Sequence, residues 1–119
     1  MFLLKVGLIV LFIGTIIYRM LPARGVPQIT PKELEKKLEE NNSQLLDVRS
    51  SREFKAYHIK GFTNIPVRAL RKNLDKLDKD KELIVICHTG VRSSDACKRL
   101  KRYGYTNLVN VKGGLSKWV

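Results

Sequence analysis

The chain contains few of the residues that hold metal ions or build disulfide frameworks. Its 119 residues include two cysteines and two histidines, and no C-x-x-C pair occurs. Protein zinc sites need several Cys or His ligands in closely spaced pairs, so the sequence predicts no metal site and no cofactor. Cys87 is expected before a helix and Cys97 within it, which favours two free thiols in a reducing compartment over a disulfide between them.

Acidic residues are also scarce. Eleven Asp and Glu oppose 23 Lys and Arg, which gives a formal net charge of +12. Such an excess suits contact with nucleic acid, an acidic partner or anionic lipid headgroups, although a solvated basic surface has the same composition. Beyond this charge, nothing in the sequence supplies the stacking platform of a nucleic-acid site, so no nucleic-acid partner is expected.

The first 21 residues contain only two charged side chains, Lys5 and Arg19. As a helix, Met1–Leu21 would be about 31 Å long, close to the thickness of a bilayer's hydrocarbon core. The uncharged stretch Val6–Tyr18 covers only about 20 Å, so both charges would have to snorkel toward the headgroups. The sequence thus predicts a transmembrane anchor over residues 1–21.

A cleaved signal peptide and a buried helix of a soluble domain are the alternatives to this anchor. Ala23-Arg24-Gly25 resembles a small-x-small cleavage site, but Arg19 and Arg24 follow the apolar core where export signals usually lack positive charge. One lysine precedes the segment and two arginines follow it, which favours a cytoplasmic C-terminus. The expected location is therefore the cell membrane, with a single pass and a cytoplasmic domain.

After a short Pro- and Gly-containing linker at residues 22–27, strand and helix patterns alternate over residues 28–119. This alternation predicts one α/β domain with a mostly parallel sheet. The expected strands are Gln28–Ile29, Gln44–Val48, Phe62–Ile65, Leu83–Ile86 and Leu108–Val111. The expected helices begin at the Thr30 cap, at Ser51, at Val67 (partly helical to Leu77) and at Arg92.

Cys87 ends the most apolar of these strands and opens a short loop before a helix. A cysteine in this position faces backbone amides and the positive end of the helix dipole, which stabilise a thiolate and the anion with which it reacts. Gly90 allows tight curvature of the loop, and Arg92 adds a positive charge that can bind an oxyanion. The remaining loop residues are His88, Thr89, Gly90, Val91 and Arg92.

Four blocks in order resemble the single-domain rhodanese (thiosulfate sulfurtransferase) superfamily. They are Leu45–Arg49 followed by Glu53-Phe54, His58–Pro66, Cys87-x-x-Gly90-x-Arg92, and Val111–Leu115 with Trp118. Tyr57 stands where the family usually has glycine. The resemblance implies a five-stranded parallel sheet flanked by helices, with the active loop at the carboxyl end of the Cys87 strand.

The resemblance also implies a sulfurtransferase. Cys87 would carry sulfane sulfur as a persulfide, taken from thiosulfate, a similar donor or a persulfide-bearing protein and passed to a thiophilic acceptor. Asp47 and Arg49 are expected to form a buried polar pair that supports the loop. His58 is expected to be a structural hydrogen-bonding residue beneath the site, and Cys97 a small buried residue, with a resolving cysteine as its alternative role.

Two other functions are alternatives to sulfur transfer. Cysteine phosphatases and arsenate reductases use a related fold, but only four residues lie between Cys87 and Arg92, one fewer than these enzymes use to cradle phosphate. A catalytically quiet interaction module at the membrane is the second alternative, although such modules usually lose the cysteine. Persulfide formation on Cys87 separates this module from an enzyme, and the sequence leaves the oligomeric state open.

Overall fold

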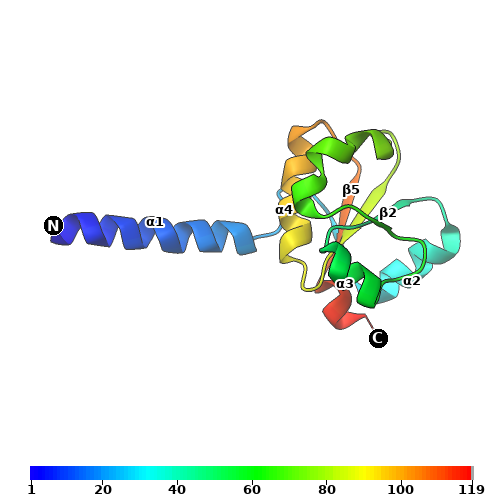
Figure 1. Ribbon diagram of the computed structural model, residues 1–119, viewed down its shortest axis with the longest axis horizontal. Helices are drawn as coiled ribbons and strands as arrows, with labels where there is room; N and C mark the ends of the chain where they lie inside the picture. The colour runs from blue at the N-terminus through cyan, green and yellow to red at the C-terminus, as the bar shows by residue number, and fades with distance from the viewer. Residues whose placement is uncertain (119) are drawn as a thin grey trace.

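The computed structural model describes residues 1–118, except for the side chain of residue 20. A single long helix projects from a small α/β domain, and the whole measures 57 × 31 × 27 Å (Figure 1). The helices are α1 (Phe2–Met20), α2 (Pro31–Glu40), α3 (Ser51–Ala56) and α4 (Val91–Arg102), with short 3₁₀ helices at Val67–Ala69, Arg71–Lys76 and Gly114–Lys117. The strands are β1 (Gln28–Ile29), β2 (Gln44–Asp47), β3 (Thr63–Asn64), β4 (Leu83–Ile86) and β5 (Leu108–Val111).

The five strands form one parallel sheet, as the resemblance implied. Their order is β1-β5-β4-β2-β3, so β4, which Cys87 directly follows, lies in the centre. All four residues of β4 are buried, because helices cover both faces of the sheet. The carboxyl ends of β2, β3 and β4 therefore meet at one edge, where ligand sites of parallel sheets form.

Alternate residues of the strands enter two separate cores. Leu83 and Val85 pack beneath α4 and the first two 3₁₀ helices, together with Ala96 and Leu100. Ile84 and Ile86 pack on the other face, where α2, α3, the C-terminal 3₁₀ helix and the residue after it contribute Leu34, Leu38, Phe54, Leu115 and Trp118. The sheet is thus the middle of three layers.

Capping fixes where two of the helices begin. Thr30 accepts a hydrogen bond from the Glu33 amide at 3.2 Å, and the Glu33 carboxylate accepts one from the Thr30 amide, so the predicted Thr30 cap is part of a capping box. Ser50 and Glu53 form a second capping box at the start of α3. Glu53 is thereby held at the edge of the sheet where the cysteine loop lies.

Several expected boundaries differ slightly from the structure. The strand predicted over Phe62–Ile65 pairs only at Thr63–Asn64, and α4 begins at Val91 rather than Arg92. The partly helical stretch to Leu77 is two 3₁₀ helices that meet at Leu70. Such short elements depend on tertiary contacts for their length, which local sequence patterns do not specify.

The segment predicted as a linker packs against the domain. Ala23 is only 5% exposed and belongs to the core under α4. The Asn110 amide donates to the Pro27 carbonyl at 2.9 Å, which extends the pairing of β1 with β5. The chain between α1 and β1 is therefore docked on the domain and does not form a free tether.

Phe2–Arg19 is the one stretch of helix in residues 1–118 that is long and apolar enough to cross a membrane. None of this stretch is buried against the domain. Its length and composition make this helix a candidate membrane span. A signal sequence near an N-terminus has the same length and composition.

Candidate active site

Cys87 lies directly after β4, at the centre of the loop that leads into α4. The residue is fully buried, whereas His88 and Thr89 form the exposed tip of the loop. The Gly90 amide donates to Cys87 Sγ at 2.9 Å, and the thiol lies 3.3 Å from Ser93 Oγ. Gly90 has a φ of 100°, a conformation that strains residues with a side chain, so glycine is required where the loop turns back over the sulfur.

The amides converge on the sulfur less completely than the sequence suggested. Among the described residues, only Gly90 donates a backbone hydrogen bond to Sγ, and α4 begins at the next residue, Val91. No side chain caps this helix, and the amides of its first turn lack partners within the helix. The positive end of the α4 dipole thus adjoins the loop and favours negative charge there.

The Gly113-Gly114 turn holds the loop in place from the other side. The Leu115 amide donates to the Cys87 carbonyl at 2.9 Å, and the Ser116 amide donates to the His88 carbonyl at 2.8 Å. A Cβ atom on Gly114 would overlap the Cys87 carbonyl oxygen and lie 2.8 Å from the His88 carbonyl oxygen. The fourth sequence block is therefore a backbone clamp on the cysteine loop.

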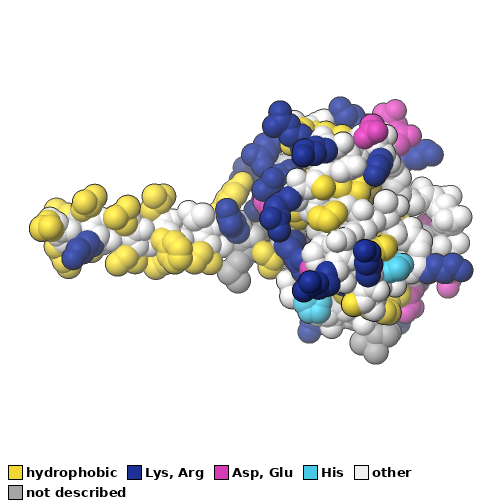
Figure 2. Space-filling view, viewed as in Figure 1, with side chains coloured by type: hydrophobic (Ala, Val, Ile, Leu, Met, Phe, Trp, Pro, Cys, Tyr) yellow, Lys and Arg dark blue, Asp and Glu magenta, His cyan; other side chains and the backbone are white. Residues whose placement is uncertain are grey.

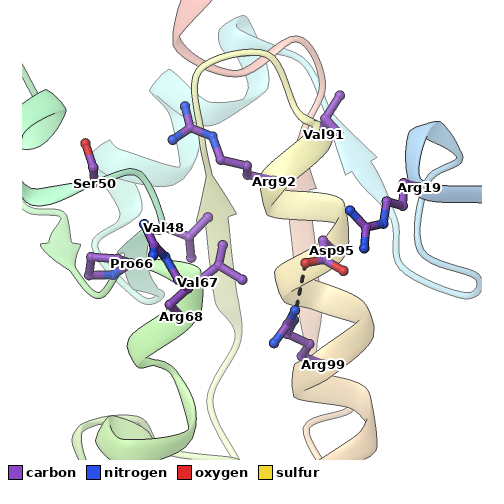
Figure 3. A pocket seen from close by; sticks show the side chains of 10 residues that line it. All are labelled: Arg19, Val48, Ser50, Pro66, Val67, Arg68, Val91, Arg92, Asp95 and Arg99. Carbon is purple, nitrogen blue, oxygen red and sulfur yellow. Dashed lines mark hydrogen bonds and ion pairs between the residues drawn. The ribbon is translucent and has the colours of Figure 1, made fainter. Parts of the chain in front are cut away.

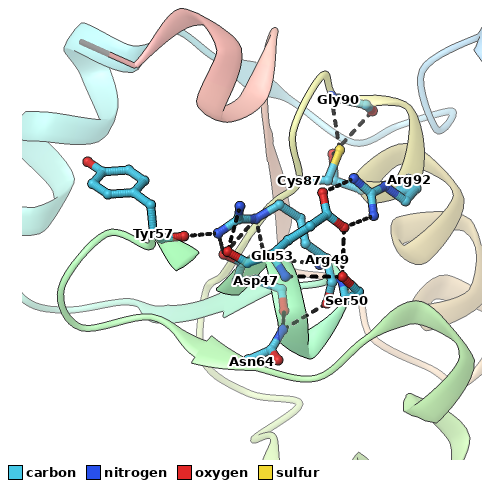
Figure 4. A network of polar contacts seen from close by, with 10 residues as sticks. Asp47, Arg49, Ser50, Glu53, Tyr57, Asn64, Cys87, Gly90 and Arg92 are labelled. Atoms are coloured by element: carbon cyan, nitrogen blue, oxygen red, sulfur yellow. Dashed lines mark hydrogen bonds and ion pairs between the residues drawn. The ribbon is translucent and has the colours of Figure 1, made fainter. Parts of the chain in front are cut away.

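Arg92 forms an ion pair with Glu53 of α3. Its two terminal nitrogens donate to the two carboxylate oxygens at 2.6 and 2.8 Å (Figure 4). The hydrogen bonds from Arg92 lower the pKa of Glu53 to about 2, and the Glu53 hydrogen bonds raise the pKa of Arg92. The sequence placed Arg92 at the loop but did not identify its partner, although Glu53 follows the first block and ends a capping box.

Asp47 and Arg49 form a buried ion pair at the end of β2. Arg49 donates to both oxygens of Asp47, with the shortest distance 2.8 Å, and the residues are 1% and 5% exposed. Arg49 also donates to the carbonyls of Tyr57 at 2.6 Å and Glu53 at 3.5 Å. The pair therefore holds α3, which carries the partner of Arg92 (Figure 4).

His58 lies on the surface rather than beneath the site. Its Nδ1 is 2.8 Å from the Phe54 carbonyl, and its ring stacks on the Phe54 ring with centroids 3.7 Å apart. The expectation of a structural hydrogen bond agrees with this contact, but the expected position is wrong because the stacked ring faces solvent.

Cys97 is buried on α4, and both thiols are free. Burial raises the pKa of the Cys97 thiol to about 12. A thiol with this pKa supplies almost no thiolate near neutral pH, which opposes the role of a resolving cysteine.

Three polar residues near the loop were not singled out from the sequence. Ser93 and Ser94 donate to the Gly90 carbonyl at 3.1 and 2.8 Å, and Asn110 of β5 donates to Ser94 Oγ at 3.1 Å. The pair of serines in the first turn of the helix was the available signal, since hydroxyls there commonly bond to nearby backbone. No group of His, Cys, Asp or Glu in the described part of the chain is arranged to hold a metal ion.

A pocket of about 340 Å³ lies beside the loop, between α4 and the segments that follow β2 and β3 (Figure 3). Four arginines and one aspartate supply its charge, and Asp95 is already paired with Arg99 at 3.2 Å. The rest of the lining is mainly apolar. The lining residues are Arg19, Val48, Ser50, Pro66, Val67, Arg68, Val91, Arg92, Asp95 and Arg99. The pocket thus suits a small anion with some apolar surface.

The arrangement of cysteine loop, Gly-Gly clamp and parallel sheet is matched by a family model. The rhodanese-like domain matches residues 30–119. The chain belongs to this family. The match includes all four blocks and the loop around Cys87.

Solved and curated proteins agree with this membership. The human single-domain sulfurtransferase TSTD1 is 30% identical, with a TM-score of 0.73 over 78% of this chain and 95% of that one. A sulfurtransferase of Allochromatium vinosum is 28% identical over 94 residues, which are 78% of this chain and 88% of that protein.

Other relatives are longer than the matched region. YrkF of Bacillus subtilis is 32% identical over 97 residues, which cover 81% of this chain and 52% of YrkF. The chain thus spans about half the length of this curated relative.

Proposed function

We propose that this rhodanese-like protein is a sulfurtransferase in which Cys87 carries sulfane sulfur as a persulfide. The observation that supports this most strongly is the setting of Sγ, which accepts a hydrogen bond from the Gly90 amide at 2.9 Å beside the uncapped start of α4. Both features stabilise an anionic sulfur. The interaction module, by contrast, has no need for a cysteine in such a setting.

In the first half of the reaction, the Cys87 thiolate attacks the outer sulfur of a donor such as thiosulfate. A new S–S bond forms on Cys87, the donor's own S–S bond breaks, and sulfite leaves with the electron pair. In the second half, a nucleophilic acceptor attacks the outer sulfur of the persulfide, and the Cys87 thiolate is the leaving group. Each half is a displacement at sulfur, so no external oxidant or reductant is needed.

Arg92 and the neighbouring pocket are proposed to bind the donor. Arg92 is fixed by Glu53 and can exchange part of this pairing for a donor oxyanion, while Arg68 supplies a second positive charge across the pocket. The volume of about 340 Å³ also admits an organic donor or the end of a persulfide-bearing protein segment. His88 and Thr89, at the exposed tip, would contact such a partner.

We also propose that α1 anchors the enzyme in the cell membrane. In this arrangement residues 1–21 form the anchor, residues 22–27 the connection and residues 28–119 the catalytic domain, which faces the cytoplasm. The exposed apolar surface of α1 supports the anchor, and Arg19 with Arg24 supports the orientation. Lipids of the membrane would then be constant neighbours of the domain.

The decisive experiment is intact-mass measurement after incubation of the full chain with thiosulfate. The wild type is expected to gain the mass of one sulfur atom and to lose it on addition of a thiol. Cys87→Ser should abolish the gain, whereas the matched substitution Cys97→Ser should retain it, because Cys97 is buried and its pKa is about 12. A sulfur adduct on the Cys87→Ser protein would overturn the assignment of the nucleophile.

A further inference from the structure

A second pocket, of about 550 Å³, lies where α1 meets the domain. It is bounded by the end of α1, the residues that follow it and the second half of α4. Four of its seven lining residues are Lys or Arg, and none is acidic. The lining residues are Tyr18, Leu21, Pro22, Arg24, Lys98, Lys101 and Arg102. Figure 2 shows Lys and Arg side chains gathered on the side of the domain nearest to α1.

The positive charges of this pocket are not neutralised by protein carboxylates. In the described part of the chain, Arg24, Lys98, Lys101 and Arg102 have no acidic partner within 4.0 Å. The neighbouring Arg99, outside the pocket, does have one in Asp95. A cluster of like charges repels itself, so an anion bound among them would be stabilised by all four.

Both lysines of this pocket are held in place by backbone carbonyls. Lys98 Nζ donates to the Tyr18 carbonyl at 2.7 Å and lies 4.0 Å from the centroid of the Tyr18 ring. Lys101 Nζ donates to the Arg24 carbonyl. An ammonium group has three donors, so each lysine retains donors for a ligand after this contact. The contacts thus organise the pocket before a ligand binds.

The position of the pocket at the end of the apolar helix indicates which kind of anion it binds. The apolar stretch Phe2–Arg19, which ends beside the pocket, has 18 residues and forms a helix of about 27 Å, close to the roughly 30 Å of a bilayer's hydrocarbon core. If α1 spans the membrane, Tyr18 and Leu21 lie at the interface and the four cations lie at the level of the phosphates. We propose that this pocket binds the headgroup of one anionic phospholipid, with the phosphate among the cations and the acyl chains along α1.

This inference rests on the proposed membrane anchor, and it adds a specific lipid site to it. Binding at one defined site would also fix how the domain sits on the membrane. The pocket beside the cysteine loop lies on the neighbouring part of α4. A bound lipid would therefore set the height of that pocket above the bilayer.

The test is native mass spectrometry of the full chain in detergent, titrated with phosphatidylglycerol or phosphatidylcholine. One phosphatidylglycerol is expected to bind at least tenfold more tightly than phosphatidylcholine. The variant Lys98→Gln/Arg102→Gln should lose this preference. The control Lys32→Gln/Lys36→Gln removes the same charge from exposed positions of α2 and should keep it.

Three results would overturn the site. They are equal binding of the two lipids, an equal loss in the control variant, and saturation of the pocket by soluble glycerol phosphate as tightly as by the lipid. A parallel flotation assay separates the two proposals. A chain that floats with liposomes of either lipid but shows no preference lacks the headgroup site only, whereas a chain that does not float lacks both the anchor and the site.

Discussion

Gly114 controls the cysteine loop without touching the sulfur. Its φ is 54°, and a Cβ atom on it would overlap the carbonyl groups of Cys87 and His88, which accept hydrogen bonds from the two amides that follow Gly114. A side chain at this position would meet backbone atoms, which cannot move aside as the end of a flexible side chain can. The shape of the loop thus depends on a residue that carries no reactive group.

Gly114→Ala is expected to destabilise the domain by about 1–3 kcal/mol, the usual cost of a strained left-handed residue, with an added cost from the displaced loop. Gly104→Ala is the matched control, because Gly104 also has a positive φ, of 94°, but its nearest atom belongs to the Lys79 side chain. Urea unfolding and thiosulfate turnover would be measured for both variants. Equal losses of turnover in the two would show that the clamp does not control the loop.

At the scale of elements, the site depends on how α3 and α4 face each other. The Arg92–Glu53 ion pair joins the first turns of these helices, and the buried Asp47–Arg49 pair holds α3 against the end of β2. Glu53 is protonated less readily in the folded than in the unfolded state. Its contribution to stability is therefore present above pH 4.5 and lost as the pH falls toward about 2.

Arg92→Lys should lower kcat/KM for thiosulfate about tenfold, or about 1.4 kcal/mol, because lysine cannot replace the two-pronged guanidinium. The free energy of unfolding should change by less than about 1 kcal/mol, as is usual for exposed ion pairs. Steady-state kinetics and urea unfolding would be compared between Arg92→Lys and the wild type.

Glu53→Gln keeps the helix cap and acts only through Arg92, so it should raise KM with little change in kcat. In the double variant Arg92→Lys/Glu53→Gln, the losses in kcat/KM should not add, because both substitutions remove the same interaction. Additive losses would contradict the positioning role of Glu53.

At the scale of the whole molecule, the docked linker joins α1 to the domain. Ala23 lies in the domain core, and Lys98 and Lys101 donate to carbonyls of Tyr18 and Arg24. If α1 is a membrane anchor, as proposed, the domain would therefore lie close to the bilayer, without a long tether between them.

The full chain is expected to remain in the membrane fraction at high salt, because salt screens charge contacts but not burial of α1. A tag after the C-terminus should resist protease added to intact cells and become cleavable after lysis, which serves as the control. Cleavage of the tag in intact cells would show that the domain faces the outside of the cell. An N-terminus near Val26 would identify α1 as a signal peptide.

Local patterns in the sequence by themselves determined most of the elements and the centre of the site. The apolar run Leu83–Ile86 and the capping residues Thr30 and Glu33 specify a strand and a helix through nearest neighbours alone. Cys87, between the strand and a following helix, is likewise placed by adjacent residues. Such features can be predicted without knowledge of the packing, because the residues that cause them lie within a few positions of one another in the sequence.

Only the tertiary structure decided which distant residues meet. Arg92 and Glu53 are 39 positions apart and pair because the parallel crossovers bring α3 and α4 to the same edge of the sheet. The contact of Gly114 with Cys87 and the burial of Ala23 arise in the same way, from the order of the strands and the packing of the helices. Hydrophobic periodicity specifies which face of an element is buried, but it carries no information about the partner on the other side.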